Sequence, residues 1–484
     1  MERTFNDTEV KKLIAEAIAP LVARIAKLET ENTALKAEVA RLKKNSSNSS
    51  KPPSSDIVKP PPPPAAGGDA KRKIGGQPGH VKHERASFTP DQIDRIVRHD
   101  RPPYAGLVPL NQWAVLQQID LAENPCVITE HRAQRFRDPA TGRIVPAAWP
   151  REVEAAGLVG PRLTALIAYL KSVCHTSFST IRKFCREVLG ATISRGQLAK
   201  VLDKVSQALQ GPHEELQALL PRQARLNVDE TGHKNNGQPW WTWCLRAPLF
   251  TYFKIDESRG SQVLLELLGA EFNGLLGCDY FSAYRKYLDL SDVRIQFCLA
   301  HLIRDVKFLI TLPDQVTAAY GQRVLSGLRR LFHVIHRRDQ MAPARFQRAL
   351  EQARDEILAV GKHAPKRNEA QNLADRFRRH GEAYFRFITT PGAVGEGVGG
   401  TTGAAEWGID PTNNLAEQAI RFVVIDRYVT QGTRSQKGRN YCQRAWTAVA
   451  TCAQQARSVY HFFGAALAAA FNGTPIPSLL PAAP

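Results

Sequence analysis

Three acidic residues in different parts of the chain are the strongest candidates for chemistry: Asp229 in RLNVDETGHK, Asp279 in GLLGCDYFSAY and Glu417 in DPTNNLAEQAIR. The first two follow short apolar runs that predict buried strands, and the third lies where a helix is expected to begin. A buried carboxylate is unfavourable unless its charge is compensated, and a divalent cation is a suitable compensator. Mg²⁺ prefers one or two carboxylates together with phosphate oxygens, and two such ions can activate one oxygen while stabilising another. The three acids therefore predict metal-dependent phosphoryl transfer.

Each acid also has a purely structural interpretation. Glu230 follows Asp229 directly, and because side chains alternate along a strand, only one of the two can face a site. Asp279 is placed to cap the helix expected immediately after it. Asn414 and Glu417 have the spacing of a capping box, in which the glutamate needs no catalytic role. Nothing in the local sequence brings the three acids together, so both interpretations stay open.

Cys298 and His301, in CLAHLIRD, have the spacing of half a zinc site. Zinc normally needs three or four protein ligands, and no second pair is evident. We therefore interpret them as a packed cysteine and a polar histidine near the site, and we expect no zinc. The cysteines include no CxxC pair, which argues against a disulfide framework or a zinc finger, and we expect most of them to be buried. The eight are Cys126, Cys174, Cys185, Cys244, Cys278, Cys298, Cys442 and Cys452.

The charge of the chain favours a polyanionic partner. It holds 65 Lys and Arg against 46 Asp and Glu, a formal net charge of +19, and nucleic acid is the commonest partner for such a protein. A membrane surface is the alternative. However, no apolar run approaches the ~20 residues needed to span a bilayer, and the N-terminus lacks the apolar core of a signal peptide. We therefore expect a cytoplasmic protein with no membrane partner.

A leucine heptad within residues 1–44 predicts an N-terminal coiled coil. Branched residues at one core position and Leu at the other favour a parallel two-stranded coil, and a single Asn fixes its register. The alternative is an amphipathic helix packed on its own domain. We expect at least a homodimer formed through this zipper. The core positions are Leu21, Leu28, Leu35 and Leu42, alternating with Ile18, Ile25, Asn32 and Val39.

Residues 45–70 are rich in Ser, Asn and Pro and predict a disordered linker. Residues 71–150 predict a small mixed module, with a strand over 125–136 and a turn over 138–143. The module begins with the basic stretch KRKIGGQPGH, which either follows DNA phosphates or forms a solvated turn. The basic residues expected to contact DNA there are Lys71, Arg72 and Lys73.

Residues 151–212 have helical periodicity and resemble a helix-turn-helix. Ser194 and Gln197 fit a capping box at the start of the last helix. Ordinary helical-bundle packing gives the same pattern, so the net charge only modestly favours a DNA-binding role. The three helices are expected over 160–174, 177–190 and 194–209, and the candidate DNA contacts are Arg195, Lys200 and Lys204.

The rest of the chain predicts a strand-rich core interrupted by helices. Residues 222–312 contain strand-like runs, 313–404 are helical and end in a Gly-rich loop, 405–472 are helical, and 473–484 form a tail. A basic, glycine-containing loop follows the Glu417 helix and suits a phosphate backbone. The candidate DNA contacts of this loop are Arg434, Lys437 and Arg439, and Arg421 of the helix is a further candidate.

These segments together resemble the transposases of the insertion-sequence-66 family. The matching motifs run in that family's order along nearly the whole chain. They are LKKNSSNSSKPPSSD after a leucine zipper, GGQPGH, the helix-turn-helix, VDET, CDYFSAY, CLAHLIRD and DPTNNLAEQAIR. Several of these motifs are weak singly, but seven in order are specific.

The resemblance implies a multidomain α+β protein with a ribonuclease-H-like catalytic core interrupted by a helical insertion. Asp229, Asp279 and Glu417 would form its Asp-Asp-Glu triad and hold Mg²⁺, with Mn²⁺ as a substitute. Water would cleave a phosphodiester at the element's end, and the freed 3′-hydroxyl would attack target DNA. Relatives carry a cysteine-rich zinc module after GGQPGH. This chain has only Cys126 there, so we expect that module to lack metal.

The expected function is therefore that of a DNA transposase acting on double-stranded element ends and target DNA. It would work in the bacterial cytoplasm, at the nucleoid when bound, and proteins of the same element are candidate helpers. Two alternatives remain open. One is a ribonuclease-H-like nuclease that cuts without joining, and the other is a catalytically silent DNA-binding relic.

Overall fold

The computed structural model describes residues 7–44, 87–99, 113–390 and 409–481. The chain divides into two compact units. The larger contains residues 1–60, 133–183 and 193–484, and the smaller contains 61–132 and 184–192. Within the described part of the smaller unit, the 3₁₀-helix Pro90–Gln92 precedes an irregular stretch. The expected mixed architecture, a helical N-terminal region and a sheet core, is confirmed.

The N-terminal segment is one long helix, α1 (Asp7–Leu42). The four heptad leucines are exposed, with 54–77% of their surface accessible in the single chain. An apolar stripe left open in this way is what the coiled-coil prediction requires. The pairing of two such helices stays a prediction.

A short hairpin follows the irregular stretch, formed by β1 (Arg135–Arg137) and β2 (Ile144–Pro146). Its turn is the expected one, because Asp138 accepts hydrogen bonds from the Ala140 N–H and the Thr141 hydroxyl. The strand expected over 125–136 was too long: residues 125–134 pair with no strand among those described.

A helical region comes next and contains the three helices predicted from the sequence. Gly190, with φ of 66°, follows the second of them, and the Ser194 hydroxyl caps the third by accepting the Gln197 N–H at 3.1 Å. The C-terminal helix α16 (Val459–Asn472) packs against this region rather than against the sheet. The region's helices are α2 (Arg151–Ala156), α3 (Pro161–Ser172), α4 (Phe178–Glu187), α5 (Arg195–Ala208) and α6 (Gln210–Leu219).

One stretch of the described residues, Arg151–Ser172, is long and apolar enough to cross a membrane by length and composition alone. In the structure it is two helices, α2 and α3, separated by a turn in which Gly157 has φ of 59°. The longer of the two has 12 residues, about 18 Å at 1.5 Å per residue. That length falls well short of a ~30 Å hydrocarbon core.

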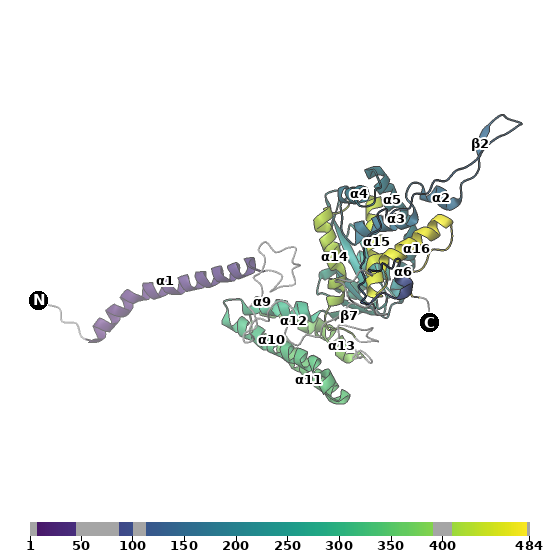
Figure 1. Cartoon of the computed structure of the whole chain (residues 1–484). Helices are drawn as coiled ribbons and strands as arrows, with labels where there is room; N and C mark the ends of the chain where they lie inside the picture. Colours follow the sequence, from purple (N-terminus) through teal and green to yellow (C-terminus); the bar gives the residue numbers. More distant parts are fainter. Residues whose placement is uncertain (1–6, 45–86, 100–112, 391–408, 482–484) are drawn as a thin grey trace, which may run out of the picture. The chain divides into compact units, whose positions relative to one another are not determined.

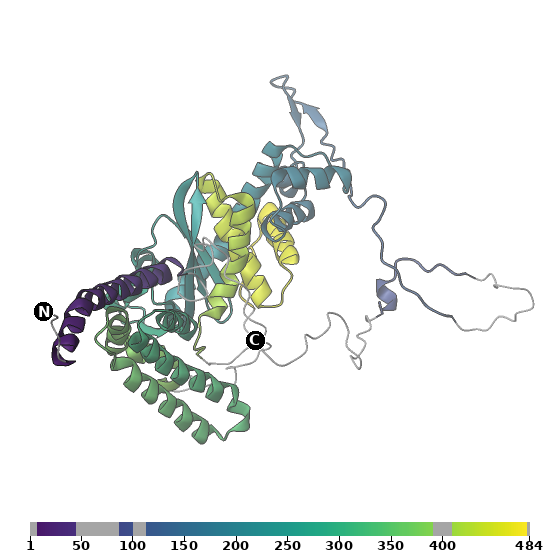
Figure 2. The same cartoon turned by 90° about the vertical axis from the view of Figure 1, so that its left-hand side faces the viewer.

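The core is a five-stranded mixed sheet in the order β5-β4-β3-β6-β7, drawn in teal in Figure 2. The first three strands form an antiparallel meander, and β6 and β7 continue the sheet in parallel with β3. All five strands lie within residues 222–312, where the sequence predicted strand-like runs. Their bounds are β3 (Arg225–Asn235), β4 (Gln238–Arg246), β5 (Thr251–Asp256), β6 (Leu275–Cys278) and β7 (Arg294–Phe297).

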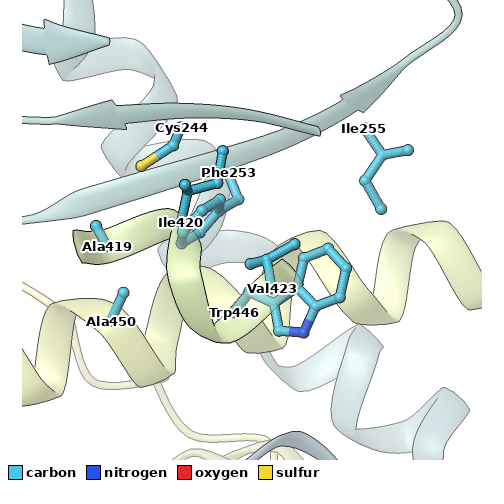
Figure 3. Close-up of a cluster of buried hydrophobic side chains, with 8 residues drawn as sticks. All are labelled: Cys244, Phe253, Ile255, Ala419, Ile420, Val423, Trp446 and Ala450. Atoms are coloured by element: carbon cyan, nitrogen blue, oxygen red, sulfur yellow. The ribbon is translucent and has the colours of Figure 1, made fainter. Parts of the chain in front are cut away.

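Two helices, α14 (Asn414–Thr430) and α15 (Gln436–Gln454), cover one face of the sheet. Phe253 from β5 packs there against Val423 and Trp446, and each of these side chains is at most 2% exposed (Figure 3). Burying a large apolar side chain contributes roughly 1.5–3 kcal/mol. This layer therefore holds α14, and Glu417 with it, firmly against the strands.

Helices α7 (Gln262–Leu268) and α8 (Ser282–Leu290) join β5, β6 and β7, and α8 lies on the opposite face, where Tyr284 meets Trp243 of β4. The chain after β7 forms α9 (Leu299–Ile310) and then the predicted helical insertion, drawn in green in Figure 1. Helices α10 and α11 pack antiparallel, and the last turns of the insertion pack on β7. The insertion comprises α10 (Gln315–His336), α11 (Pro343–Lys362), α12 (Asn368–His380), a 3₁₀-turn (Gly381–Tyr384) and α13 (Arg386–Thr389).

Candidate active site

Strand register separates the two adjacent acids on β3. Asp229 lies opposite Cys244 of β4, and Cys244 belongs to the core beneath α14 and α15. Glu230 lies opposite Trp243, whose ring meets Tyr284 on the other face. Directly opposed residues of neighbouring strands share a face. Asp229 therefore faces the side of the sheet that carries Glu417, and Glu230 faces away from it.

Asp279 follows the last residue of β6, the strand next to β3. Asn227 pairs with Gly277 across these two strands, so continuing the register places Asp279 beside Asp229. Asp279 is not the N-cap of α8, since that helix begins at Ser282 after Phe281. One Asp279 carboxylate oxygen instead accepts the backbone N–H of Phe281 at 2.9 Å.

Glu417 lies in the first turn of α14, but it does not complete a capping box. The helix begins at Asn414 with Asn413 as its N-cap, and no side chain caps it. The Glu417 carboxylate instead approaches His301 Nδ1 at 3.5 Å and an Arg304 guanidinium nitrogen at 3.6 Å. The capping interpretation of Glu417 is therefore wrong, which leaves its carboxylate available to a site.

Asn413 joins the start of α14 to the sheet, a role that its local sequence does not predict. Its side-chain amide donates to the Val228 carbonyl at 2.8 Å and accepts from the Asn227 amide at 3.0 Å. Its backbone N–H donates to the Cys298 sulfur at 3.2 Å. A Cβ on Gly277 would come within 2.5 Å of Asn227, so only glycine leaves room for this network. The tandem asparagines of DPTNN were the available signal, but their partners lie far away in sequence.

The pKa of each of the three predicted acids is raised. Burial is the largest cause for each, and it raises the pKa of Asp229, Asp279 and Glu417 above their ordinary values. Repulsion from Glu230, Asp279 and Glu417 raises the pKa of Asp229 further. Repulsion from Asp279 acts in the same direction on Glu417, although Arg304 partly opposes it. The site is therefore an end of the sheet where negative charge is concentrated and incompletely compensated.

Glu230 is a fourth buried acid, and its charge is paired within the protein. Arg259 donates two hydrogen bonds to one of its oxygens, at 2.7 and 3.0 Å, and the Tyr284 hydroxyl donates to the other. Burial and repulsion from Asp279 nevertheless raise the pKa of Glu230 to about 7. Arg259 lies over the rings of Trp241 and Phe281, which holds this pair in place.

Cys298 and His301 lie beside Glu417, as the sequence analysis expected of a packed cysteine and a histidine near the site. Cys298 Sγ, a ring nitrogen of His301 and a Glu417 oxygen all lie within 4.8 Å of one another. Burial raises the pKa of Cys298 to about 11 and lowers that of His301 to about 4. The sequence missed the third member because Glu417 comes from a distant helix. Five of the eight cysteines are buried, as expected, and all eight are free.

The candidate DNA contacts of the helical region differ in their availability. Lys200 is exposed, and Arg195 is exposed while donating to the Ser179 hydroxyl. Lys204 instead donates to the carbonyls of Ala155 and Ala156, at 2.7 and 2.9 Å, at the end of α2. This lysine is engaged within the protein, and its contact with DNA stays a prediction. Lys71, Arg72 and Lys73 lie outside the described residues.

The basic loop after α14 is shorter than the sequence suggested. Helix α15 begins at Gln436, so Lys437 and Arg439 are helical, and Arg444 in the same helix donates to Ser206. Lys437 pairs with Asp203 and Arg439 lies over the Trp240 ring. Arg421 and Arg434 are exposed.

The comparisons with known proteins agree with this architecture. Residues 156–396 match the model of the family described as Transposase IS66 family. That class consists of DNA-acting enzymes, and the match covers Asp229 and Asp279 but ends before Glu417. The chain belongs to the IS66 family of transposases. Residues 2–86 match a family of unknown function (DUF6444), and no curated protein matches the chain.

Proposed function

We propose that this transposase cleaves and joins DNA through an Asp-Asp-Glu triad formed by Asp229, Asp279 and Glu417. The observation that carries the proposal is the clustering of three buried carboxylates from β3, the end of β6 and α14, each with a raised pKa. Groups that serve only the fold are normally compensated, whereas strongly perturbed acids gather at functional sites. The strand order supports a ribonuclease-H-like core that presents these acids at one end of the sheet.

The acids fit divalent cations. Their mutual repulsion is the kind of uncompensated charge that a hard cation relieves, and carboxylate oxygens are the ligands that Mg²⁺ and Mn²⁺ prefer. Asp229, Asp279 and Glu417 would hold the ions. Bound ions would supply Lewis acidity and a nucleophilic oxygen at neutral pH.

The chain's own residues orient this site. Asn413 fixes the start of α14 against β3, and the Arg304 guanidinium lies 3.6 Å from the Glu417 carboxylate. The Phe281 N–H holds the Asp279 carboxylate. No protein nucleophile is needed, because positioning and charge stabilisation suffice for phosphoryl transfer.

Double-stranded DNA is the proposed partner. The net charge of +19 supplies general attraction to phosphates. The proposed contacts that the structure leaves exposed are Arg195, Lys200, Arg421, Arg434 and Lys437. The exposed leucine stripe of α1 supports pairing of two chains, which would bring two element ends together.

The experiment that tests the proposal uses a labelled duplex carrying the flanking element end, with wild type beside Asp279→Asn. We expect wild type to cut only with Mg²⁺ or Mn²⁺ and then to join the freed 3′-end to target DNA, whereas the variant does neither. Cutting without joining would instead indicate a nuclease. If the Asp279→Asn variant were as active as wild type, Asp279 would not belong to the triad. If both proteins bound the duplex but neither cut it, the chain would be a catalytically silent DNA-binding relic.

A further inference from the structure

We propose that Cys298, His301 and Glu417 form a binding site for zinc, which shares Glu417 with the all-carboxylate site and adds a thiolate and an imidazole. The ligand atoms converge from two separate elements. Cys298 directly follows β7, His301 lies one turn later in α9, and Glu417 comes from the first turn of α14. Among the described residues, these form the one group of at least three His, Cys, Asp or Glu side chains whose ligand atoms all lie within 4.8 Å of one another.

The spacing of Cys298 and His301 follows from helix geometry. Residues three apart on a helix lie on the same face, one above the other. Cys298 is the N-cap of α9 and His301 is its third residue, so both side chains face the start of α14. The hydrogen bond from the Leu299 N–H to the Pro411 carbonyl, at 2.9 Å, holds the two segments together.

Two polar atoms of the group are buried without a hydrogen-bond partner, and these are His301 Nδ1 and Glu417 Oε1. His301 is 9% exposed. The two atoms are 3.5 Å apart, but their geometry does not make a hydrogen bond. Buried polar atoms are nearly always satisfied, so this pair points to a missing ligand between them.

The third ligand atom has the surroundings of a metal-bound sulfur. Cys298 is 1% exposed, and its sulfur accepts the Asn413 N–H at 3.2 Å. Hydrogen bonds to the ligands from the surrounding shell are a regular feature of protein metal sites. Asn413 is itself held by Val228 and Asn227, so the donor is fixed relative to the sulfur.

The donor set selects the metal. Thiolate and imidazole suit zinc, whereas Mg²⁺ takes oxygen ligands. Three protein ligands leave a fourth position open, as zinc sites often do. The Cys298 thiolate and the Glu417 carboxylate together match the charge of one Zn²⁺. Arg304 lies 3.6 Å from Glu417 and would have to yield part of its contact with that carboxylate.

Because Glu417 is shared, zinc and the triad's hard cation compete for it. This consequence rests on the proposed function, whereas zinc binding itself rests only on the three ligands. Zinc held by Cys298 and His301 draws Glu417 away from Asp229 and Asp279. We therefore expect zinc to suppress DNA cleavage at a Mg²⁺ concentration that otherwise supports it.

The binding test titrates the metal-free full chain with Co²⁺, which reports thiolate ligation by a sulfur-to-cobalt charge-transfer band. We expect one equivalent to bind, with the band lost in Cys298→Ser and kept in Cys174→Ser, which removes an exposed thiol elsewhere. Zn²⁺ should displace the cobalt. Glu417→Gln keeps the thiol and should weaken cobalt binding by at least about tenfold. A band that is absent in wild type, or that survives Cys298→Ser, overturns the site.

A second measurement separates this site from the triad. Cleavage is followed at fixed Mg²⁺ while zinc is added, and each protein is compared with its own zinc-free rate. Zinc should inhibit wild type and Cys174→Ser alike, and Cys298→Ser should be markedly less sensitive. Equal sensitivity of Cys298→Ser and wild type overturns the competition. If no protein cleaves DNA at all, the proposed function fails while the cobalt result still decides the metal site.

Discussion

Two clusters of buried charge differ in how their charges are compensated. At the base of the insertion, Asp305 of α9 pairs with Arg376 of α12 at 2.8 Å. Arg376 also donates to the Tyr384 hydroxyl and lies over the Tyr280 ring. At the end of the sheet, by contrast, Asp229 has only a backbone donor, the N–H of Glu230.

This difference separates charge that serves the fold from charge that awaits a ligand. The pKa of Arg376 is raised despite its burial, chiefly because Tyr384 and Asp305 stabilise its charged form. The pKa of Asp229 is raised because its charged form is disfavoured. A compensated pair stabilises the folded chain, whereas clustered acids cost stability that a bound cation returns. Neutralising an acid is therefore expected to raise the stability of the metal-free protein at the end of the sheet and to lower stability at the base of the insertion.

The largest effect is expected from Asp279→Asn. It should lower DNA cleavage by about a thousandfold or more, since losing a metal ligand removes several kcal/mol of transition-state stabilisation. The same change should raise the melting temperature of the metal-free protein, because it removes one of several buried like charges. Cleavage assays and thermal unfolding in a chelator measure the two effects. A variant that is both inactive and less stable would place Asp279 among the fold-stabilising charges instead.

A large effect of opposite sign is expected from Asp305→Asn. It leaves Arg376 largely buried without its carboxylate partner, and breaking such a pair costs about 3 kcal/mol. Denaturant unfolding measures this loss, and Asp355→Asn is the control, because Asp355 is an exposed acid of the adjoining insertion. An unfolding free energy equal to that of the control would mean that Tyr280 and Tyr384 hold Arg376 without Asp305.

A moderate effect is expected in the pH dependence of stability. The folded chain raises the pKa of Glu230 from its ordinary 4.5 to about 7. The folded state therefore binds this proton more tightly than the unfolded state, so stability falls as pH rises between these values. Thermal unfolding in a chelator should show this fall, and Glu230→Gln should flatten it. A slope that is the same in the variant would mean that Arg259 and Tyr284 compensate Glu230 fully.

The strands could be predicted from sequence, and the three acids could be proposed as a site, because each signal is local. An apolar run marks each of β3 and β6, and an acid follows or ends it. Which of Asp229 and Glu230 faces α14 could not be predicted, because it depends on the register with β4. The role of Glu417 was open because its spacing from Asn414 fits a capping box. In the structure Asn414 is the first residue of the helix, not its N-cap.

Contacts between distant segments escaped prediction altogether. Asn413 joins α14 to β3 and to the β7–α9 junction, and no spacing rule relates those three segments. The contact of Glu417 with Cys298 and His301 could not be predicted for the same reason. The two lysines of α5 show the limit most simply, since Lys200 and Lys204 lie one turn apart in similar local sequence. Only the packing of α2 against α5 distinguishes them.

The smallest effect is expected from substituting these two lysines. They extend to cations the distinction between charge that serves the fold and charge that binds a ligand. Lys200 is exposed, so Lys200→Ala should weaken DNA binding and reduce the salt dependence of log Kd by about one phosphate contact. Lys204 is held by the carbonyls that end α2, so Lys204→Ala should lower stability and leave the salt dependence unchanged. Binding titrations at several salt concentrations, paired with thermal unfolding, measure both. If Lys204→Ala reduced the salt slope as much as Lys200→Ala, the hydrogen bonds of Lys204 to α2 would have to open when DNA binds. Hydrogen bonding within the fold would then no longer distinguish a structural charge from a charge that binds a ligand.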